Sequence, residues 1–421
     1  MSVHDLLRAL FNKLDQEHIQ YCLLRDQDRL DELTSGAEID LLVQKSQLAQ
    51  MACLLAQLGF VRLSSWGYAP HHFFVGYEQP TDSWFKVDVI TEVAFGQPIA
   101  ALRTDLAIPA LDSRRRDGRV FIPAPECELV MLLLHCVLDK HQITPDRGRR
   151  LQILRGQVQD ESYLSALLAA YWLPAMSWPQ LALLIETENW TSLLAVRKAL
   201  VARLTQRDRL GTWGRYLRER ILRKLSKLSS ASRPRAPMVA LLAPDGAGKS
   251  TLIARIPQRF YFPVCAIYMG LDPKNTKKSL RLPLSGIGLV RRLLTLWQRY
   301  LLAWVHHLRR KLVVFDRYTY DALLSSPQST PWGKRIRRRL LAYSCPAPDL
   351  IIFLDAPGEV LYDRKREHTA AQLEQQRQQY LALRTVLPQL VVVDATHEPE
   401  DVRREVTALI WQQYLRYQAG C

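Results

Sequence analysis

The sequence predicts an α/β protein with three regions: an N-terminal α+β domain, a helical middle region, and a C-terminal parallel sheet with helices on both faces. After residue 238, short β-branched runs alternate with helical stretches, which is typical of a parallel sheet buried on both sides. Before that point, helix and strand patterns are first mixed and then purely helical. The expected regions are 1–119, 120–228, a linker rich in Ser, Pro and Arg at 229–237, and 238–421.

Seven apolar runs are expected to form the main strands. Two lie in the N-terminal domain, at 39–43 and 84–90, and five in the C-terminal domain, at 238–243, 264–269, 311–316, 350–355 and 390–394. Each of the five ends in a polar or glycine-containing loop. Because ligands of parallel sheets bind at the carboxyl ends of the strands, these loops are where we expect the chemistry of the C-terminal domain.

The basic charge of the chain is concentrated in one block. The 421 residues contain 57 Lys and Arg against 41 Asp and Glu, a net charge of +16. Residues 201–350 alone contain 30 basic and 7 acidic residues. Such a block attracts polyanions, phosphorylated substrates or anionic lipid. The possible partners are therefore a small phosphorylated acceptor and, through this block, an anionic membrane surface or nucleic acid.

Cysteine usage and hydropathy favour a cytoplasmic protein. The seven cysteines are scattered without a CxxC pair, which suggests neither a zinc ribbon nor a disulfide framework. The first 20 residues lack the apolar core and cleavage site of a signal peptide. Residues 162–185 carry no formal charge, but Pro174 and Pro179 should divide them into two buried helices, the second capped by Ser177.

A phosphate-binding loop is predicted where the first C-terminal strand runs into APDGAGKSTL. Glycines allow successive backbone N–H groups to point at phosphate oxygens, and the following helix adds the partial positive charge of its N-terminus. Lys249 should reach the outer phosphates of ATP, and the Ser250 hydroxyl should bind Mg²⁺. Ala243 stands where the standard pattern has its first glycine. The expected nucleotide-binding residues are Asp245, Gly246, Ala247, Gly248, Lys249, Ser250 and Thr251.

The C-terminal domain resembles thymidylate kinases over residues 238–417. The resemblance is carried, in order, by DGAGKST, VVFDRYTYDAL, PDLIIFLDAPGEVLYDRKRE and VVVDATHEPEDV. It implies a P-loop kinase in which the loop at Asp394, Ala395 and Thr396 contacts adenine and a lid carries Arg364 and Arg366.

Position suggests roles for the charged residues of this domain. At the end of a central strand, Asp316 can hold Mg²⁺ through water, and Arg317 can grip the acceptor phosphate as a bidentate fork. The lid arginines Arg364 and Arg366 are expected to stabilise the transferring phosphoryl group, because the P-loop itself contains no arginine. Their alternative role is that of an exposed helix face.

Two segments leave the acceptor open. The Arg-Glu-Pro-Gly loop of thymidylate kinases is absent, and Lys274, Lys277 and Lys278 stand in its place. A nucleoside monophosphate remains the first expectation, with another small phosphorylated compound as the alternative. Residues 288–311 predict a basic amphipathic helix, which should pack on the sheet and floor the acceptor site or, alternatively, dock on an anionic membrane or an acidic partner.

The N-terminal domain contains three acidic residues that predict a metal site. Glu38 and Asp40 lie two apart on one strand and therefore share a face, and a later strand supplies Asp88. This pattern resembles the nucleotidyltransferase superfamily, in which such carboxylates hold divalent cations. The Gly-Ser pair of that superfamily, which would provide a backbone cradle for the triphosphate, is missing from YCLLRDQDRL. A strand with outward-facing acids is the structural alternative, and His71 and His72 are not expected to bind metal.

The sequence thus leaves three functions open. The first is a Mg²⁺-dependent kinase that uses ATP at Lys249, Asp316 and Arg317. The second is a nucleotidyltransferase at Glu38, Asp40 and Asp88, with the P-loop domain accessory. The third is an ATP-gated module that binds nucleic acid or a membrane, and a homodimer is possible in each case. The N-terminal site is alternatively a degenerate, regulatory partner of the kinase.

Overall fold

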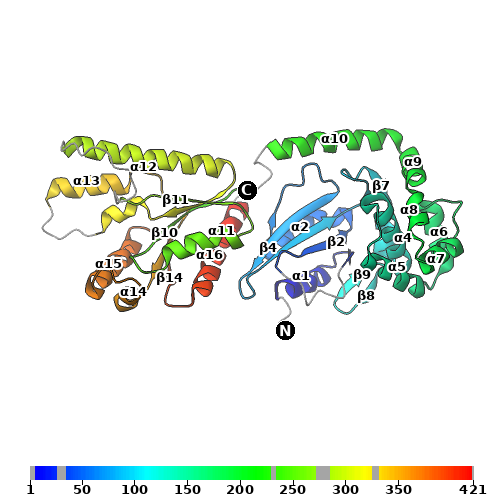
Figure 1. Ribbon diagram of the computed structural model, residues 1–421, viewed down its shortest axis with the longest axis horizontal. Helices are drawn as coiled ribbons and strands as arrows, with labels where there is room; N and C mark the ends of the chain where they lie inside the picture. The colour runs from blue at the N-terminus through cyan, green and yellow to red at the C-terminus, as the bar shows by residue number, and fades with distance from the viewer. Residues whose placement is uncertain (1–4, 26–34, 229–233, 272–284, 325–330, 420–421) are drawn as a thin grey trace. The chain divides into compact units, whose positions relative to one another are not determined.

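The computed structural model describes residues 5–25, 35–228, 234–271, 285–324 and 331–419, and the chain divides into two compact units, Met1–Ser232 and Arg233–Cys421 (Figure 1). The division falls inside the expected linker at 229–237, of which residues 229–233 lie outside the described residues. The end of that linker needs correction. Ala236 is fully buried, and the Pro237 carbonyl accepts a hydrogen bond from the Val313 amide, so this stretch packs with the second unit.

A five-stranded mixed sheet forms the base of the first unit, in the order β1-β2-β5-β4-β3. Its strands are β1 (Tyr21–Leu23), β2 (Glu38–Val43), β3 (Val61–Arg62), β4 (His71–Glu78) and β5 (Ser83–Ile90). Only β2 and β5 run parallel. Helices α1 (Asp5–Gln16) and α2 (Leu48–Gln57) share a core with Ile39, Leu41 and Val87. Because side chains alternate along a strand, Glu38, Asp40 and Asp88 belong to the other face.

Two small hairpins and a set of helices complete the first unit. The hairpins pair β6 (Val93–Phe95) with β7 (Leu102–Thr104) and β8 (Arg115–Asp117) with β9 (Val120–Ile122). The helices are α3 (Ala107–Asp112), α4 (Pro125–Leu134) with a π-helical continuation (His135–Lys140), α5 (Pro145–Gln157), α6 (Glu161–Tyr171), α7 (Trp178–Glu186), α8 (Trp190–Ala195), α9 (Arg197–Arg207) and α10 (Arg209–Leu228). In the described part of the chain, we find no helix of the length and apolarity needed to cross a membrane.

Three details of the helical region bear on the sequence predictions. Residues 162–185 do form two helices, α6 and α7, and Ser177 caps α7 in a capping box with Gln180. The expectation that residues 120–228 are helical throughout is wrong at the start, because β9 precedes α4. No separate core begins at residue 120 either, since Cys22 and Leu42 of the sheet share one core with Leu133.

The second unit contains the predicted parallel sheet. Its strands are β10 (Met238–Leu242), β11 (Val264–Tyr268), β12 (Leu312–Asp316), β13 (Leu350–Asp355) and β14 (Leu390–Asp394), in the order β11-β12-β10-β13-β14. All neighbours pair in parallel, so the five predicted strands are confirmed. Its helices are α11 (Lys249–Arg259), α12 (Ser285–Leu308), α13 (Trp332–Ala342), α14 (Gly358–Arg364), α15 (Ala370–Ala382) and α16 (Pro399–Ala419).

Helices cover both faces of this sheet. Leu296 of α12, Leu341 of α13 and Tyr380 of α15 share a core with Phe315 and Phe353. On the other face, α11 and α16 pack against each other and the strands (Figure 1). Alternating residues of each strand are buried on each side, which explains the continuous apolar runs in the sequence.

The amphipathic helix predicted at 288–311 is α12, and it is apolar on two sides. Leu296 and Ala303 are buried on the sheet, as expected for packing. A second row of large apolar side chains is exposed, among them Leu294 at 59 % and Leu301 at 52 %. Packing on the sheet is therefore confirmed, whereas a role in an acceptor site stays a prediction.

Substitution of Leu133 tests the shared core of the first unit. Leu133→Ala should lower the free energy of unfolding of this unit by about 2–5 kcal/mol, because it opens a cavity among buried residues of sheet and helices. Leu183→Ala, at a position 59 % exposed, is the control. Calorimetry of the full chain should show the transition of the whole first unit shift as one. A shift confined to the helices, with the sheet melting separately, would refute a common core.

Candidate functional site

The glycines of the P-loop are required by backbone geometry. Gly246 has φ = +92°, and a Cβ at this position would lie 2.6 Å from the carbonyl oxygen of Leu361 in α14. Gly248 has φ = +83° and precedes the first residue of α11. L-residues rarely adopt such a backbone conformation, and any side chain at Gly246 would also clash with α14. The loop therefore curls tightly between β10 and α11, as the sequence predicts.

Lys249 and Asp316 meet at the carboxyl edge of the parallel sheet. The register pairs Leu241 of β10 with Asp316 of β12, so both strands end at the same level. The Lys249 Nζ atom lies 3.3 Å from the Asp316 Oδ1 atom, and the lysine side chain is only 9 % exposed. Burial and the nearby Arg317 lower the pKa of Lys249, while Asp316 opposes this shift. Two sequence-predicted residues, 67 positions apart, are thus brought together.

Arg317 is held in an unusual backbone conformation between two acids. It has φ = +62°, which is uncommon for a residue other than glycine. Its Nη2 atom donates to Asp245 at 2.7 Å, and its Nη1 atom lies 3.6 Å from a carboxylate oxygen of Asp321. Strained residues that the surroundings hold in place concentrate at functional sites. The guanidinium at the end of β12 is therefore engaged by the P-loop aspartate.

Sequence reasoning missed the support behind Arg317. Asp321 lies in the 3-10 helical turn Thr319–Leu323, and the buried Tyr380 hydroxyl of α15 donates to it at 3.0 Å. Burial raises the pKa of Asp321, and the charge of Arg317 lowers it. The spacing of Arg317 and Asp321, four residues apart, was a usable signal for the ion pair. Tyr380 gave no such signal, because it is 59 residues away.

The structure places the lid and adenine-loop residues beside one another. The Arg364 Nη1 atom donates to the Ala395 carbonyl at 2.8 Å, and Thr396 donates from its amide and hydroxyl to Asp394. Arg366 is exposed. Arg364 thus contacts the loop that is expected to bind the base, and its predicted role at the transferring phosphoryl group stays a prediction.

One residue near the P-loop was not predicted from the sequence. His368 follows the lid arginines, and its Nε2 atom lies 3.8 Å from a carboxylate oxygen of Asp245. Ser250 and Thr251 are exposed in the first turn of α11, where a phosphate or cation can reach their hydroxyls. Lys274, Lys277 and Lys278 lie outside the described residues.

The three acids of the first unit form one cluster. Asp40 and Asp88 are register partners in the parallel pair β2–β5, and one oxygen each of Glu38, Asp40 and Asp88 lies within 4.8 Å of the other two. Lys86 contacts Glu38 at 2.7 Å, and Arg25 contacts Asp40 at 3.4 Å. Oxygen ligands of this kind suit Mg²⁺ or Mn²⁺. The structure thus brings the three carboxylates together as predicted, and metal binding by them stays a prediction.

Burial and mutual repulsion give the cluster its electrostatic character. Burial raises the pKa of Asp40 to about 6, Arg25 opposes the shift, and Asp88 and Glu38 add to it. Asp88 is 5 % exposed, and its Oδ1 atom is buried without a hydrogen-bond partner. The other oxygen of Asp88 lies 2.7 Å from His71 Nδ1, a contact that sequence reasoning did not foresee. A cation would satisfy the orphaned oxygen and relieve the repulsion.

A cavity of about 820 Å³ contains this cluster, which is large enough for a nucleotide-sized ligand. Besides the three acids, it is lined by groups from four other parts of the unit. These include Arg25 after β1, Gly96 and Pro98 after β6, His135, Arg147 and Arg150 from the helical region, and Arg223 of α10. The cavity therefore combines an acidic face with cationic side chains that suit a phosphorylated ligand.

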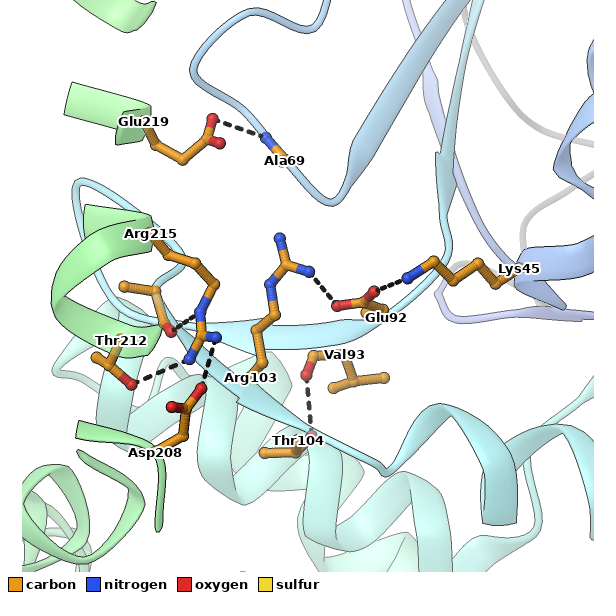
Figure 2. Close-up of polar contacts among 11 residues, drawn as sticks. Lys45, Ala69, Glu92, Val93, Arg103, Thr104, Asp208, Thr212, Arg215 and Glu219 are labelled. Atoms are coloured by element: carbon orange, nitrogen blue, oxygen red, sulfur yellow. Dashed lines mark hydrogen bonds and ion pairs between the residues drawn. The ribbon is translucent and has the colours of Figure 1, made fainter. Parts of the chain in front are cut away.

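Polar contacts fix the segments around this cavity, as Figure 2 shows. Glu92, just after β5, accepts hydrogen bonds from Lys45 and from Arg103 of β7. Arg215 of α10 donates to the Ala101 carbonyl at 3.1 Å, and Glu219 of the same helix accepts from the Ala69 amide at 3.4 Å. These contacts tie α10 and the β6–β7 hairpin to the sheet. These hydrogen bonds restrain segments that border the cavity.

Comparisons with known proteins add no assignment. A scan against protein-family models matches no family to this chain, and a search of curated proteins finds no match. Functional conclusions consequently depend on the residues and the geometry of the two sites.

The raised pKa of Asp40 predicts a pH-dependent stability. The folded state binds this proton more tightly than the unfolded chain, whose ordinary value is 3.8, so the contribution is present below about pH 4 and is lost as pH rises through about 6. At pH 7.5 and without divalent cations, Asp40→Asn should stabilise the first unit by about 1–3 kcal/mol. Thermal denaturation with the exposed Asp112→Asn as control measures this. Equal stability of Asp40→Asn and the unchanged chain at pH 7.5 would show that burial and the neighbouring carboxylates do not disfavour the charge of Asp40.

Proposed function

We propose that the second unit is a Mg²⁺-dependent phosphotransferase that moves a phosphoryl group from ATP to a small phosphorylated acceptor. The observation that carries this proposal is the meeting of Lys249 with Asp316, 3.3 Å apart at the carboxyl edge of a parallel sheet. A P-loop by itself indicates nucleotide binding. Asp316 on the neighbouring strand, which pairs with Lys249, adds a carboxylate that can position Mg²⁺ for phosphoryl transfer. ATP and Mg²⁺ are the cofactors that this arrangement fits.

The charged groups of the site have distinct roles in this reaction. The loop amides and the start of α11 hold phosphate oxygens, and Lys249 neutralises charge that develops on the transferring group. Ser250 and Asp316 supply the oxygens for Mg²⁺. When bound, Mg²⁺ neutralises phosphate charge and aligns the transferred group. Arg317, which is restrained by Asp245 and Asp321, is placed to exchange one carboxylate for the phosphate of the acceptor.

The class of acceptor follows from the resemblance to thymidylate kinases and from the chemistry of Arg317. A guanidinium fork favours a phosphorylated acceptor, and a nucleoside monophosphate is the first candidate. Arg364 donates a hydrogen bond to the Ala395 carbonyl, so a role at the phosphoryl group would require this side chain to leave that contact.

Removal of the Lys249 charge tests the kinase proposal. Lys249→Ala should reduce ADP formation by at least about 10²–10³-fold, because a charge that stabilises the transition state is lost from a buried site. ADP is measured with Mg²⁺-ATP and a panel of nucleoside monophosphates, sugar phosphates and lipid acceptors. Lys198→Ala, which removes an exposed lysine of the first unit, is the control. If no acceptor yields ADP in a Lys249-dependent manner, the second unit is not a kinase.

A second activity, nucleotidyl transfer by the first unit, is favoured by the cavity around the carboxylates. Glu38, Asp40 and Asp88 would hold the divalent cation that orients a nucleoside triphosphate, and the volume of about 820 Å³ suits nucleotide and acceptor groups. Arg25 lies two residues after the end of β1. This is the segment in which the nucleotidyltransferase superfamily has its Gly-Ser pair and this chain does not. The Arg25 guanidinium is a substitute for the absent backbone cradle, since it lines the same cavity.

Loss of two carboxylates tests this second activity. Asp40→Asn combined with Asp88→Asn should abolish transfer of label from an α-labelled nucleoside triphosphate, because two of three cation ligands are lost. ADP formation by the second unit should persist in the same protein. Label transfer that survives the double substitution would exclude a reaction at this cluster, and nucleotide binding without transfer in the unchanged chain would indicate a regulatory site.

A further inference from the structure

The cavity of the first unit is lined by a histidine, His135, that has no part in the roles proposed for the three carboxylates, whether nucleotidyl transfer or regulation. His135 is the first residue of the π-helical segment His135–Lys140, which continues α4. Such segments are rare and occur frequently at functional sites. His135 lines the same cavity as Glu38, Asp40 and Asp88. Its place in the fold therefore brings an imidazole to the wall of the predicted nucleotide site.

One ring nitrogen of His135 is firmly engaged. The Nδ1 atom lies 2.9 Å from a carboxylate oxygen of Asp139, and the other oxygen of Asp139 accepts from the Gly96 amide at 2.6 Å. The side chains of His135 and Asp139 are only 16 % and 14 % exposed. A carboxylate can only accept, so Nδ1 carries the hydrogen and donates it. Asp139, itself fixed by Gly96, thus sets the orientation and tautomer of the ring.

The second ring nitrogen has no partner. The Nε2 atom of His135 is buried and makes no hydrogen bond within the described structure. Burial lowers the pKa of His135, the hydrogen bond with Asp139 opposes this, and the charges of Arg25 and Lys140 lower the pKa further. The ring is therefore neutral near pH 7, and Nε2 holds a free electron pair. Catalytic hydrogen bonds often form fully only in the complex with substrate, and Nε2 is the ring atom left to make one.

We propose that His135 is the general base of the first unit and that Asp139 is its positioning residue, an inference that rests on nucleotidyl transfer as the activity of this unit. His135 Nε2 removes the proton from a hydroxyl group of the acceptor. The hydroxyl oxygen forms a bond to the α-phosphorus of the nucleoside triphosphate. The bond between that phosphorus and the bridging oxygen breaks, and pyrophosphate leaves with the electron pair.

The acceptor is consequently an alcohol. A hydroxyl group is a weak nucleophile at neutral pH unless a base removes its proton, whereas a neutral amine already has an available electron pair. A base oriented by a second, anchored side chain follows the general arrangement of activated hydroxyl nucleophiles. His135 and Asp139 supply this arrangement, and the three carboxylates supply the cation face of the same cavity.

Chemical rescue tests the proposal in the full chain. The assay measures pyrophosphate from Mg²⁺-ATP with glycerol as the hydroxyl acceptor, a product that phosphoryl transfer by the second unit does not release. His135→Ala should lower the rate by about 10²–10⁴-fold, and added imidazole should restore at least about tenfold by filling the vacated space. His135→Gln, which can still donate to Asp139, should lose the same rate without rescue. His72→Ala replaces a histidine that does not line the cavity and should retain the rate.

The outcomes separate the base from the activity it serves. Asp139→Asn should also lower the rate, and imidazole should not restore it, because the ring of His135 still fills the position. Pyrophosphate release at the unchanged rate in His135→Ala or His135→Gln would overturn the role of His135 and leave nucleotidyl transfer standing. A reduced rate of His135→Ala that imidazole fails to restore would also overturn the role of His135 as the base. No pyrophosphate from the unchanged chain would overturn both the activity and its base.

Discussion

Parallel pairing of two strands creates both candidate sites of this chain. In the first unit, the register of β2 and β5 sets Asp40 opposite Asp88, and Glu38 lies two residues before Asp40 on the same face. In the second unit, the register of β10 and β12 ends both strands at one edge, where Lys249 meets Asp316. Buried backbone hydrogen bonds fix these registers and with them the backbone positions of Asp40, Asp88 and Asp316. Each sheet thus places its charged side chains at fixed positions close to one another.

The two sites balance their charges differently, and this difference explains the roles proposed for them. Around the P-loop, cations and anions alternate: Lys249 pairs with Asp316, and Arg317 lies between Asp245 and Asp321. A phosphate ligand would meet cations that are already held in place there. The first unit instead gathers three acids with only partial compensation by Arg25 and Lys86, and it leaves the Asp88 Oδ1 atom without a partner. Such a cluster costs stability, because burial and neighbouring like charges disfavour the ionised carboxylates.

Local sequence patterns predicted the parts of the fold that depend on neighbouring residues. The apolar runs of the parallel sheet, the curl at Gly246 and Gly248, and the shared face of Glu38 and Asp40 all follow from spacing along the chain. The parts that were missed depend on contacts between distant segments. The Tyr380 hydroxyl reaches Asp321 across 59 residues, and Gly96 anchors Asp139 across 43. The helical region looked independent because amphipathic periodicity shows that a face is buried, but not that it shares a core with the sheet.

Two separate nucleotide sites in one chain are the central claim, and binding stoichiometry tests it most directly. Calorimetric titration of the full chain with Mg²⁺ and the β,γ-imido analogue of ATP counts the molecules bound without turnover at the γ-phosphate. The account predicts two per chain, one after Lys249→Ala and one after Asp40→Asn with Asp88→Asn. A single bound nucleotide in the unchanged chain, whichever substitution removes it, would contradict the account.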